Sequence, residues 1–237
     1  ATPARPEQRD PKVRKALSYA VRRNVITDQI LQAGQKPAYS FTHWATADFE
    51  LPTIDYSQMS QDARMEKAME LMQEAGYGPD NPLDLDLIYN TSENHKQIAI
   101  AVSQMWKPLG VNITLSNYEW QSYLDIRGNQ QFDIARSAWC ADYNEASTFL
   151  DLLDSQSGYN DGKYSNERVD ELLEQAKTSD DTSPLYTEVE EILYEEMPVI
   201  PIYHYAGVYM LDSDLGGWPV DNVEQNWYSK DLYKIAE

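Results

Sequence analysis

Cysteine and histidine are scarce in this 237-residue sequence, which contains a single cysteine, Cys140, and three widely separated histidines at positions 43, 95 and 204. One cysteine excludes an internal disulfide. Neither an HExxH nor a CxxC motif is present, and GxGxxG, GxxxxGK(S/T) and GxSxG motifs are missing too. These absences remove the usual signals for metal binding, nucleotide binding and serine hydrolysis, so we expect no cofactor and no metal.

Basic residues are also few, because 19 Lys and Arg stand against 39 Asp and Glu and give a net charge of -20. Nucleic acids and anionic membranes attract Lys/Arg-rich surfaces, so this balance argues against both as partners. No run of about 18 apolar residues predicts a transmembrane helix. The polar, Pro-rich start has no apolar segment of a signal peptide and no initiator methionine, which predicts a mature chain or a fragment.

The composition is that of a folded protein, with 42% hydrophobic and 11% aromatic residues. A chain of this length can form one large domain, or one domain plus a fragment of another. The 17 tyrosines and six tryptophans are numerous, and such side chains suit pockets and interfaces. The aromatic content therefore favours a binding protein, either for a small ligand or, as an alternative, for a partner protein at a Tyr-rich face.

Helical and strand patterns alternate along the chain and predict an α/β lobe. Asp10 as N-cap and Pro11 at the first position predict the start of a helix that ends near residue 23. Further helices are predicted over 25–31, 61–75, 95–106, 119–127, 145–153, 166–177 and 184–197. Strands are predicted over 83–89, 111–115, 132–139 and 197–205, and a long ordered loop over 34–60.

The stretch FDIARSAWCADYNE, residues 132–145, carries the strongest candidate site. Its alternating first half predicts a strand, which runs into Trp139, Cys140 and Asp142, with Arg136 upstream. An apolar wall with two opposite charges suits a zwitterionic ligand. The alternative is ordinary packing of the tryptophan beside a surface ion pair.

A peptide is an ammonium and a carboxylate joined by amides, so its capture requires groups of both charges and a free strand edge. Asp142 can hold the ammonium, and Arg136 can bind a carboxylate with its guanidinium fork. The backbone of Ala138 and Cys140 can add the ligand as an extra strand. These residues together predict a peptide site.

An enzymatic alternative uses Asp142 and Glu145 as an acid/base pair of a hydrolase. Three residues of separation on a turn fix no distance between the two carboxylates, however. Cys140 has no histidine near it in the sequence that could activate a nucleophile. We therefore expect a binding protein and not an enzyme.

The same stretch, together with DPKVRKALSYAVRR and LIYNTSENHKQIAIA, resembles the C-terminal half of the periplasmic oligopeptide-binding proteins of ABC importers. These proteins belong to the peptide/nickel class of extracytoplasmic solute-binding proteins, family 5. The resemblance implies one lobe of a two-lobed, type II-like periplasmic-binding-protein fold, an α/β fold with a mixed sheet and helices on both faces. It further implies a monomer that captures short peptides between two lobes and delivers them to ABC transporter permease subunits. A murein tripeptide-binding relative of the same fold is the alternative.

The resemblance also assigns roles to single residues. It implies that Asp142 holds the peptide ammonium, and that the other candidates receive carboxylates or line side-chain pockets: Arg136, Arg127, His95, Trp139, Trp120, Asn160 and Tyr205. At Leu31 and Gln32 the chain departs from the family, whose oligopeptide binders carry a lysine there that reaches longer ligands. Residues 1–205 would form the ligand-binding lobe, and 206–237 a tail that in the family completes the N-terminal lobe, which is absent from this sequence.

Overall fold

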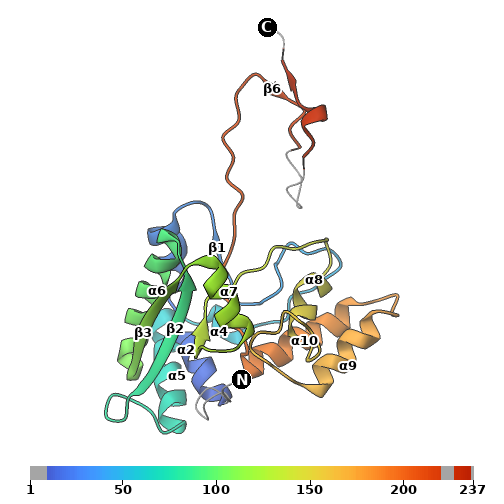
Figure 1. The fold of residues 1–237 in the computed structure, drawn as a ribbon. Coiled ribbons are helices and arrows are strands. Elements are labelled where there is room, and N and C mark those ends of the chain that lie inside the picture. Colours follow the sequence, from blue (N-terminus) through green and yellow to red (C-terminus); the bar gives the residue numbers. More distant parts are fainter. Residues whose placement is uncertain (1–9, 220–226, 236–237) are drawn as a thin grey trace.

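The computed structural model describes residues 10–219 and 227–235. The Pro-rich lead before Asp10 and parts of the predicted tail therefore lie outside the described residues. Within the described part, helices surround a small sheet, and a C-terminal segment projects from the resulting lobe (Figure 1). This arrangement confirms the predicted α/β fold class.

The first helix, α2 (Pro11–Ala20), begins where the sequence predicts. The carboxylate of Asp10 caps it by accepting a 2.8 Å hydrogen bond from a backbone N–H of the first turn. The helix ends before its predicted limit, and a second helical stretch follows. This stretch consists of α3 (Arg23–Val25) and the π-helical η1 (Ile26–Leu31), which ends where Gln32 adopts a left-handed φ of 55°.

The loop predicted over 34–60 contains one strand and the short helix α4 (Asp55–Gln58). The long helix α5 (Gln61–Glu74) follows, capped by the Ser60 hydroxyl, which accepts a 3.2 Å hydrogen bond from a first-turn N–H. The helix predicted over 61–75 is confirmed, and Ala68, Leu71 and Met72 form its buried face.

Three parallel strands form the central sheet in the order β3-β2-β4. Helix α6 packs along β2 and β3, and α7 packs on β2, so helices flank this sheet (Figure 1). The elements, in chain order, are β2 (Leu83–Asn90), α6 (Glu93–Trp106), the 3-10 turn η2 (Lys107–Leu109), β3 (Val111–Tyr118), α7 (Trp120–Gly128) and β4 (Ile134–Ala135).

The strand predicted over 132–139 is wrong in its length, since only the two residues of β4 pair with β2. Arg136 still donates its backbone N–H to the carbonyl of Ile88 at 2.9 Å. Its own carbonyl accepts a hydrogen bond from the hydroxyl of Tyr123 on α7. The sheet ladder ends at this point, and the residues that follow leave the sheet.

Antiparallel pairing occurs in two separate ribbons, not within the central sheet. One joins β1 (Lys36–Pro37) to β5 (Tyr203–His204), and the other joins β6 (Leu215–Gly216) to β7 (Tyr233–Lys234). The strand predicted over 197–205 is thus reduced to β5. The prolines that precede β5 have no N–H to donate, which prevents a longer ladder.

Two hydrophobic clusters make up the core. The larger one includes residues of α2, α4, α5, α6 and β2, and the smaller one includes helical residues between 147 and 196. In the larger cluster, Tyr56 stacks on Tyr19 at a centroid distance of 4.7 Å and on Tyr194 at 5.6 Å. Part of the tyrosine content is therefore core packing. The helices of the smaller cluster are α8 (Ser147–Leu150), the 3-10 turn η3 (Asp151–Leu153), α9 (Glu167–Ala176) and α10 (Ser183–Glu196).

The C-terminal segment leaves the lobe after β5. Residues 206–214 have no helix or strand and run away from the lobe to the β6–β7 ribbon, which includes the 3-10 turn η4 (Ser229–Asp231) (Figure 1). The boundary that the resemblance predicts between residues 205 and 206 lies at this departure. That the segment completes a second lobe stays a prediction.

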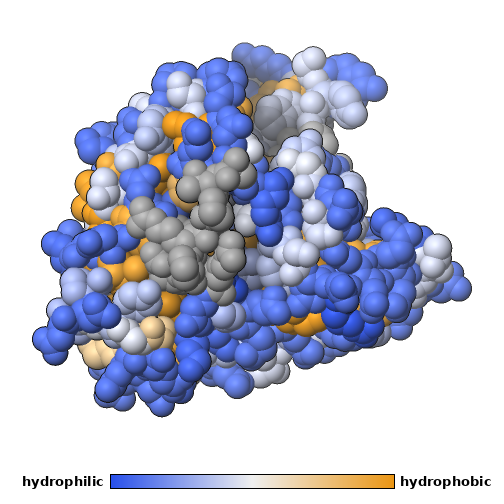
Figure 2. Space-filling model, turned by 60° about the horizontal axis from the view of Figure 1, so that its bottom comes forward, coloured by the Kyte–Doolittle hydropathy of each residue, from blue (hydrophilic) through white to orange (hydrophobic). Residues whose placement is uncertain are grey.

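Hydrophilic side chains dominate the face shown in Figure 2, and hydrophobic side chains gather there only in scattered patches. This surface fits the net charge of -20. Among the residues that the structure describes, no helix is both long enough and apolar enough to cross a membrane.

Candidate functional site

A cavity of about 1760 Å³ is lined by members of both hydrophobic clusters. Its size exceeds that of a drug-sized pocket and leaves room for a ligand with water. Ala38, in the loop predicted over 34–60, lines it. The lining comes from segments far apart in the sequence, namely α2, β2, α6 and residues within 38–46, 127–144, 149–165 and 196–205.

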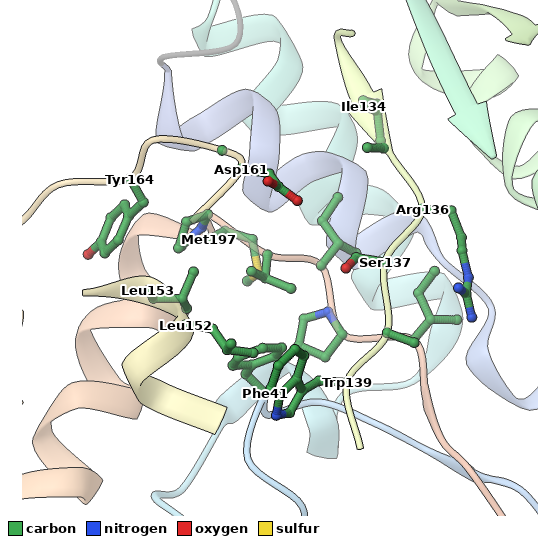
Figure 3. A pocket seen from close by; sticks show the side chains of 18 of the residues that line it. Phe41, Ile134, Arg136, Ser137, Trp139, Leu152, Leu153, Asp161, Tyr164 and Met197 are labelled. Atoms are coloured by element: carbon green, nitrogen blue, oxygen red, sulfur yellow. The ribbon is translucent and has the colours of Figure 1, made fainter. Parts of the chain in front are cut away.

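Residues 137–141, termed here the open edge, run along this cavity. Among the described residues, their backbone groups make no hydrogen bond with other backbone groups. Ala138 and Cys140 are exposed. Figure 3 shows Arg136 and Ser137 projecting to opposite sides of the chain, as in a strand. The open edge can therefore accept the backbone of an extended ligand as an additional strand.

Aromatic side chains form one end of the cavity. The ring of Trp139 meets that of Tyr159 edge to face at 5.1 Å, and Phe41 meets Phe149 in the same way at 6.3 Å. Figure 3 shows Trp139 beside Phe41, although these residues come from distant parts of the chain. The Nε1 atom of Trp139 is buried without a hydrogen-bond partner in the described part of the chain. This end combines apolar contact area with one unused donor.

The two arginines of the site have different partners. The guanidinium of Arg127, in the last turn of α7, forms an ion pair with Asp161 and lies 5.6 Å from the ring centroid of Tyr123. The guanidinium of Arg136 donates to the hydroxyl of Tyr205. All of these side chains except Tyr123 line the cavity. Arg127 is thus balanced by a carboxylate, whereas the bond of Arg136 is to a neutral phenol.

His95 lines the cavity from the first turn of α6. Its Nδ1 atom is buried and has no hydrogen-bond partner among the described residues. Burial lowers the pKa of the imidazole, and the positive charge of Arg136 lowers it further. The lowered pKa favours the neutral imidazole, and the predicted contact of His95 with a ligand carboxylate stays a prediction. His95 can still donate or accept a hydrogen bond.

Three predicted residues occupy other surroundings. Asp142 is exposed next to the open edge, outside the cavity lining, and its carboxylate has no hydrogen bond or ion pair within the described residues. Trp120 is half exposed, stacks on Tyr123 at 6.1 Å and also lies outside the lining. Asn160 does line the cavity, but its buried amide binds backbone groups of Asp154 and Tyr164.

Sequence reasoning missed several residues of the cavity. Phe41 and His43 lie in the predicted loop, where no periodicity indicated an inward direction, and Asp161 lies in a turn. The ring of His43 contacts that of His204 at 4.7 Å, and burial lowers the pKa of His204 to about 4. Only a three-dimensional structure could have revealed that His43 and His204 are partners, because they lie far apart in the sequence.

The geometry gives the enzymatic alternative no support. The carboxylate of Glu145 accepts hydrogen bonds from the hydroxyls of Tyr186, at 2.5 Å, and Ser147. Neither Glu145 nor Asp142 lines the cavity. Among the described residues, no group of three or more His, Cys, Asp or Glu side chains could hold a metal ion. What the arrangement can do is bind an extended, polar ligand.

An α/β lobe with an open strand edge over a large, partly aromatic cavity defines a ligand-binding lobe. Comparison with known proteins gives its family. The model of "Bacterial extracellular solute-binding proteins, family 5 Middle" matches residues 3–161. The chain therefore belongs to the family 5 bacterial extracellular solute-binding proteins, as the resemblance indicated.

Individual relatives agree with this assignment. The chain is 43% identical over 230 residues to the periplasmic murein peptide-binding protein of Escherichia coli strain K12, covering 95% of this chain and 43% of that protein. It is 40% identical to the periplasmic oligopeptide-binding protein of Salmonella typhimurium strain LT2, covering 95% of this chain and 42% of that protein.

A solved structure shares the fold. The Haemophilus influenzae oligopeptide-binding protein in complex with RPPGFSPFR superimposes with a TM-score of 0.85 at 35% identity, covering 96% of this chain and 46% of that one. The chain thus spans less than half of the length of the relatives it matches. It is similar to one lobe of a two-lobed periplasmic binding protein.

Proposed function

We propose that the full-length protein containing this chain captures short peptides and delivers them to an ABC transporter. The open edge carries the proposal, because unpaired backbone groups beside a cavity can bind any peptide through its amides. Asp142 holds the α-ammonium of the ligand, and Arg136 binds a carboxylate. Trp139 packs against ligand side chains, and His95 contributes a neutral hydrogen bond. Because the affinity comes from the backbone and the termini of the ligand, the protein binds peptides of different sequence.

The missing part of the protein supplies the opposite wall of the site. Asp142 and Trp120 are exposed in this lobe and become covered when a second lobe closes over the ligand. The segment 206–237 returns to complete that second lobe, so that residues 1–205 form the lobe described here. The protein acts as a monomer in the periplasm, like the relatives whose names place them there. It is not an enzyme.

Both peptide classes named for the relatives fit this site. A murein tripeptide and an oligopeptide present an extended backbone with terminal charges, and the contacts proposed here recognise those shared features. The loss of the lysine at Leu31 and Gln32 removes a contact to the longest peptides. Short peptides are therefore the preferred class.

Native mass spectrometry of the full-length protein tests the proposal. The protein is incubated with a pool of dipeptides to pentapeptides that includes a murein tripeptide, and bound ligands are released and weighed. We expect intact peptides in complex with the protein and no new masses in the pool after prolonged incubation. Shortened peptides would instead indicate a hydrolase, and a complete absence of bound peptides would contradict peptide capture.

A further inference from the structure

The loop between α8 and α9 places a carboxylate inside the candidate site. Asp161 points into the cavity (Figure 3), and its carboxylate forms an ion pair with Arg127. The exposed fractions of the two side chains are 24% and 18%, so the pair is largely shielded from water. Shielding makes an ion pair stronger and less sensitive to salt than a surface pair.

The position of Asp161 is fixed by its neighbour. The Nδ2 atom of Asn160 donates to the carbonyls of Asp154, at 3.1 Å, and Tyr164, at 2.8 Å. The Oδ1 atom of Asn160 accepts a 3.0 Å hydrogen bond from the N–H of Tyr164. Three hydrogen bonds from one buried amide close the loop on itself. The carboxylate of Asp161 is therefore presented to Arg127 by a constrained turn.

The pairing changes what each arginine can do for a ligand. A ligand carboxylate that approaches Arg127 meets the negative charge of Asp161 at the same guanidinium, and repulsion offsets the attraction. A carboxylate that approaches Arg136 competes with tyrosine hydroxyls, those of Tyr205 and Tyr203, and not with a carboxylate partner. The two arginines therefore differ in their ability to bind an anion, although both line the same cavity.

We propose that Asp161 determines the charge selectivity of the site by neutralising Arg127. The site then accepts peptides whose side chain beside Arg127 is uncharged, and discriminates against an acidic side chain there. This inference rests on the proposed peptide-binding function and adds to it the class of peptide that is preferred. Asp161 acts as a specificity determinant that tunes Arg127 and does not itself anchor the ligand.

The test uses the full-length protein and two pairs of matched peptides, Ala-Gln-Ala with Ala-Glu-Ala and Ala-Ala-Gln with Ala-Ala-Glu. Calorimetric titration gives the ratio of Glu to Gln affinity within each pair. Asp161→Asn keeps the shape of the side chain but frees the charge of Arg127. We expect this ratio to rise by about tenfold or more for at least one pair. Asp180→Asn, an exposed position outside the cavity lining, is the control of equal charge and should leave the ratios unchanged.

A second variant covers the case in which Asp161→Asn does not fold. Arg127→Gln leaves Asp161 unpaired, and the same ratio should then fall by about tenfold. Ratios that stay within about twofold of the wild type in every folded variant overturn the role of Asp161. If no peptide binds the wild-type protein at all, the proposed function itself fails, which is a separate and distinguishable outcome.

Discussion

Two buried charged residues, Arg23 and Glu190, join segments of this lobe that are distant in the sequence. Arg23 is fully buried, and its guanidinium donates to the carbonyls of Ala38, at 2.6 Å, Pro201, at 2.9 Å, and Ser18, at 2.9 Å. One side chain thus links three parts of the chain: the helix α2, the loop that contains Ala38, and the residues that precede β5. Its hydrogen bonds compensate for the cost of burying a charge.

Replacement of this cation should be severe. Arg23→Met fills the same space but leaves buried carbonyls without donors, so we expect the free energy of unfolding to fall by about 3 kcal/mol or more. Urea unfolding of the full-length protein measures the change. Arg22→Met, at the exposed neighbouring position, is the matched control and should change it by less than about 0.5 kcal/mol. Equal losses for both variants would contradict the role of Arg23.

At the residue scale, the sequence predicted several residues that line the site. It did not predict which other residues these side chains contact. Arg136, Trp139 and Cys140 were predicted from a local pattern and line the cavity. The partner of Arg127 could not be predicted, because Asp161 lies 34 positions away in a turn without periodicity. Partners distant in sequence are fixed by tertiary packing, which local patterns do not record.

At the scale of elements, the helices and the two long strands, β2 and β3, followed the sequence closely, whereas the other two predicted strands did not. The helix predicted over 184–197 corresponds to α10, because apolar periodicity is a local signal. The strands predicted over 132–139 and 197–205 shrank to β4 and β5. A strand requires a partner, and here prolines and a side-chain hydroxyl remove the groups that would continue each ladder.

A buried carboxylate connects α10 to the loop that contains Phe41 and Thr42. Glu190 on α10 is 2% exposed and accepts hydrogen bonds from the backbone N–H groups of Phe41, at 3.2 Å, and Thr42, at 2.5 Å. Burial raises the pKa of this carboxyl group, and the hydrogen bonds oppose that shift. The contact positions the loop that carries Phe41 into the cavity.

Loss of this contact should loosen the loop. We expect Glu190→Ala to lower the free energy of unfolding by about 2 kcal/mol and to speed hydrogen exchange at the amides of Phe41 and Thr42. Hydrogen exchange read by mass spectrometry on the full-length protein measures the local effect. Glu191→Ala, which removes an exposed carboxylate one position further on, should leave both amides as they are. Unchanged exchange in the Glu190 variant would refute the anchoring role.

At the scale of the whole molecule, the proposed function makes this site one wall of a two-lobed structure. The cavity lies between two hydrophobic clusters, while the open edge and Asp142 face outward without a cover. The relatives are about twice as long as this chain, since it covers 43% and 42% of their lengths. An exposed carboxylate beside an unpaired edge is what one half of a closing peptide site presents.

The central claim is that Asp142 holds the amino end of a peptide whose backbone joins the open edge. Calorimetric titration of the full-length protein with Ala-Ala-Ala and with its N-acetylated form compares the wild type with Asp142→Asn. We predict that the variant loses about 2 kcal/mol of binding free energy for the free-amine peptide and less than about 0.5 kcal/mol for the acetylated one. An equal loss for both peptides would contradict the account, because the carboxylate would then have no partner in the ammonium.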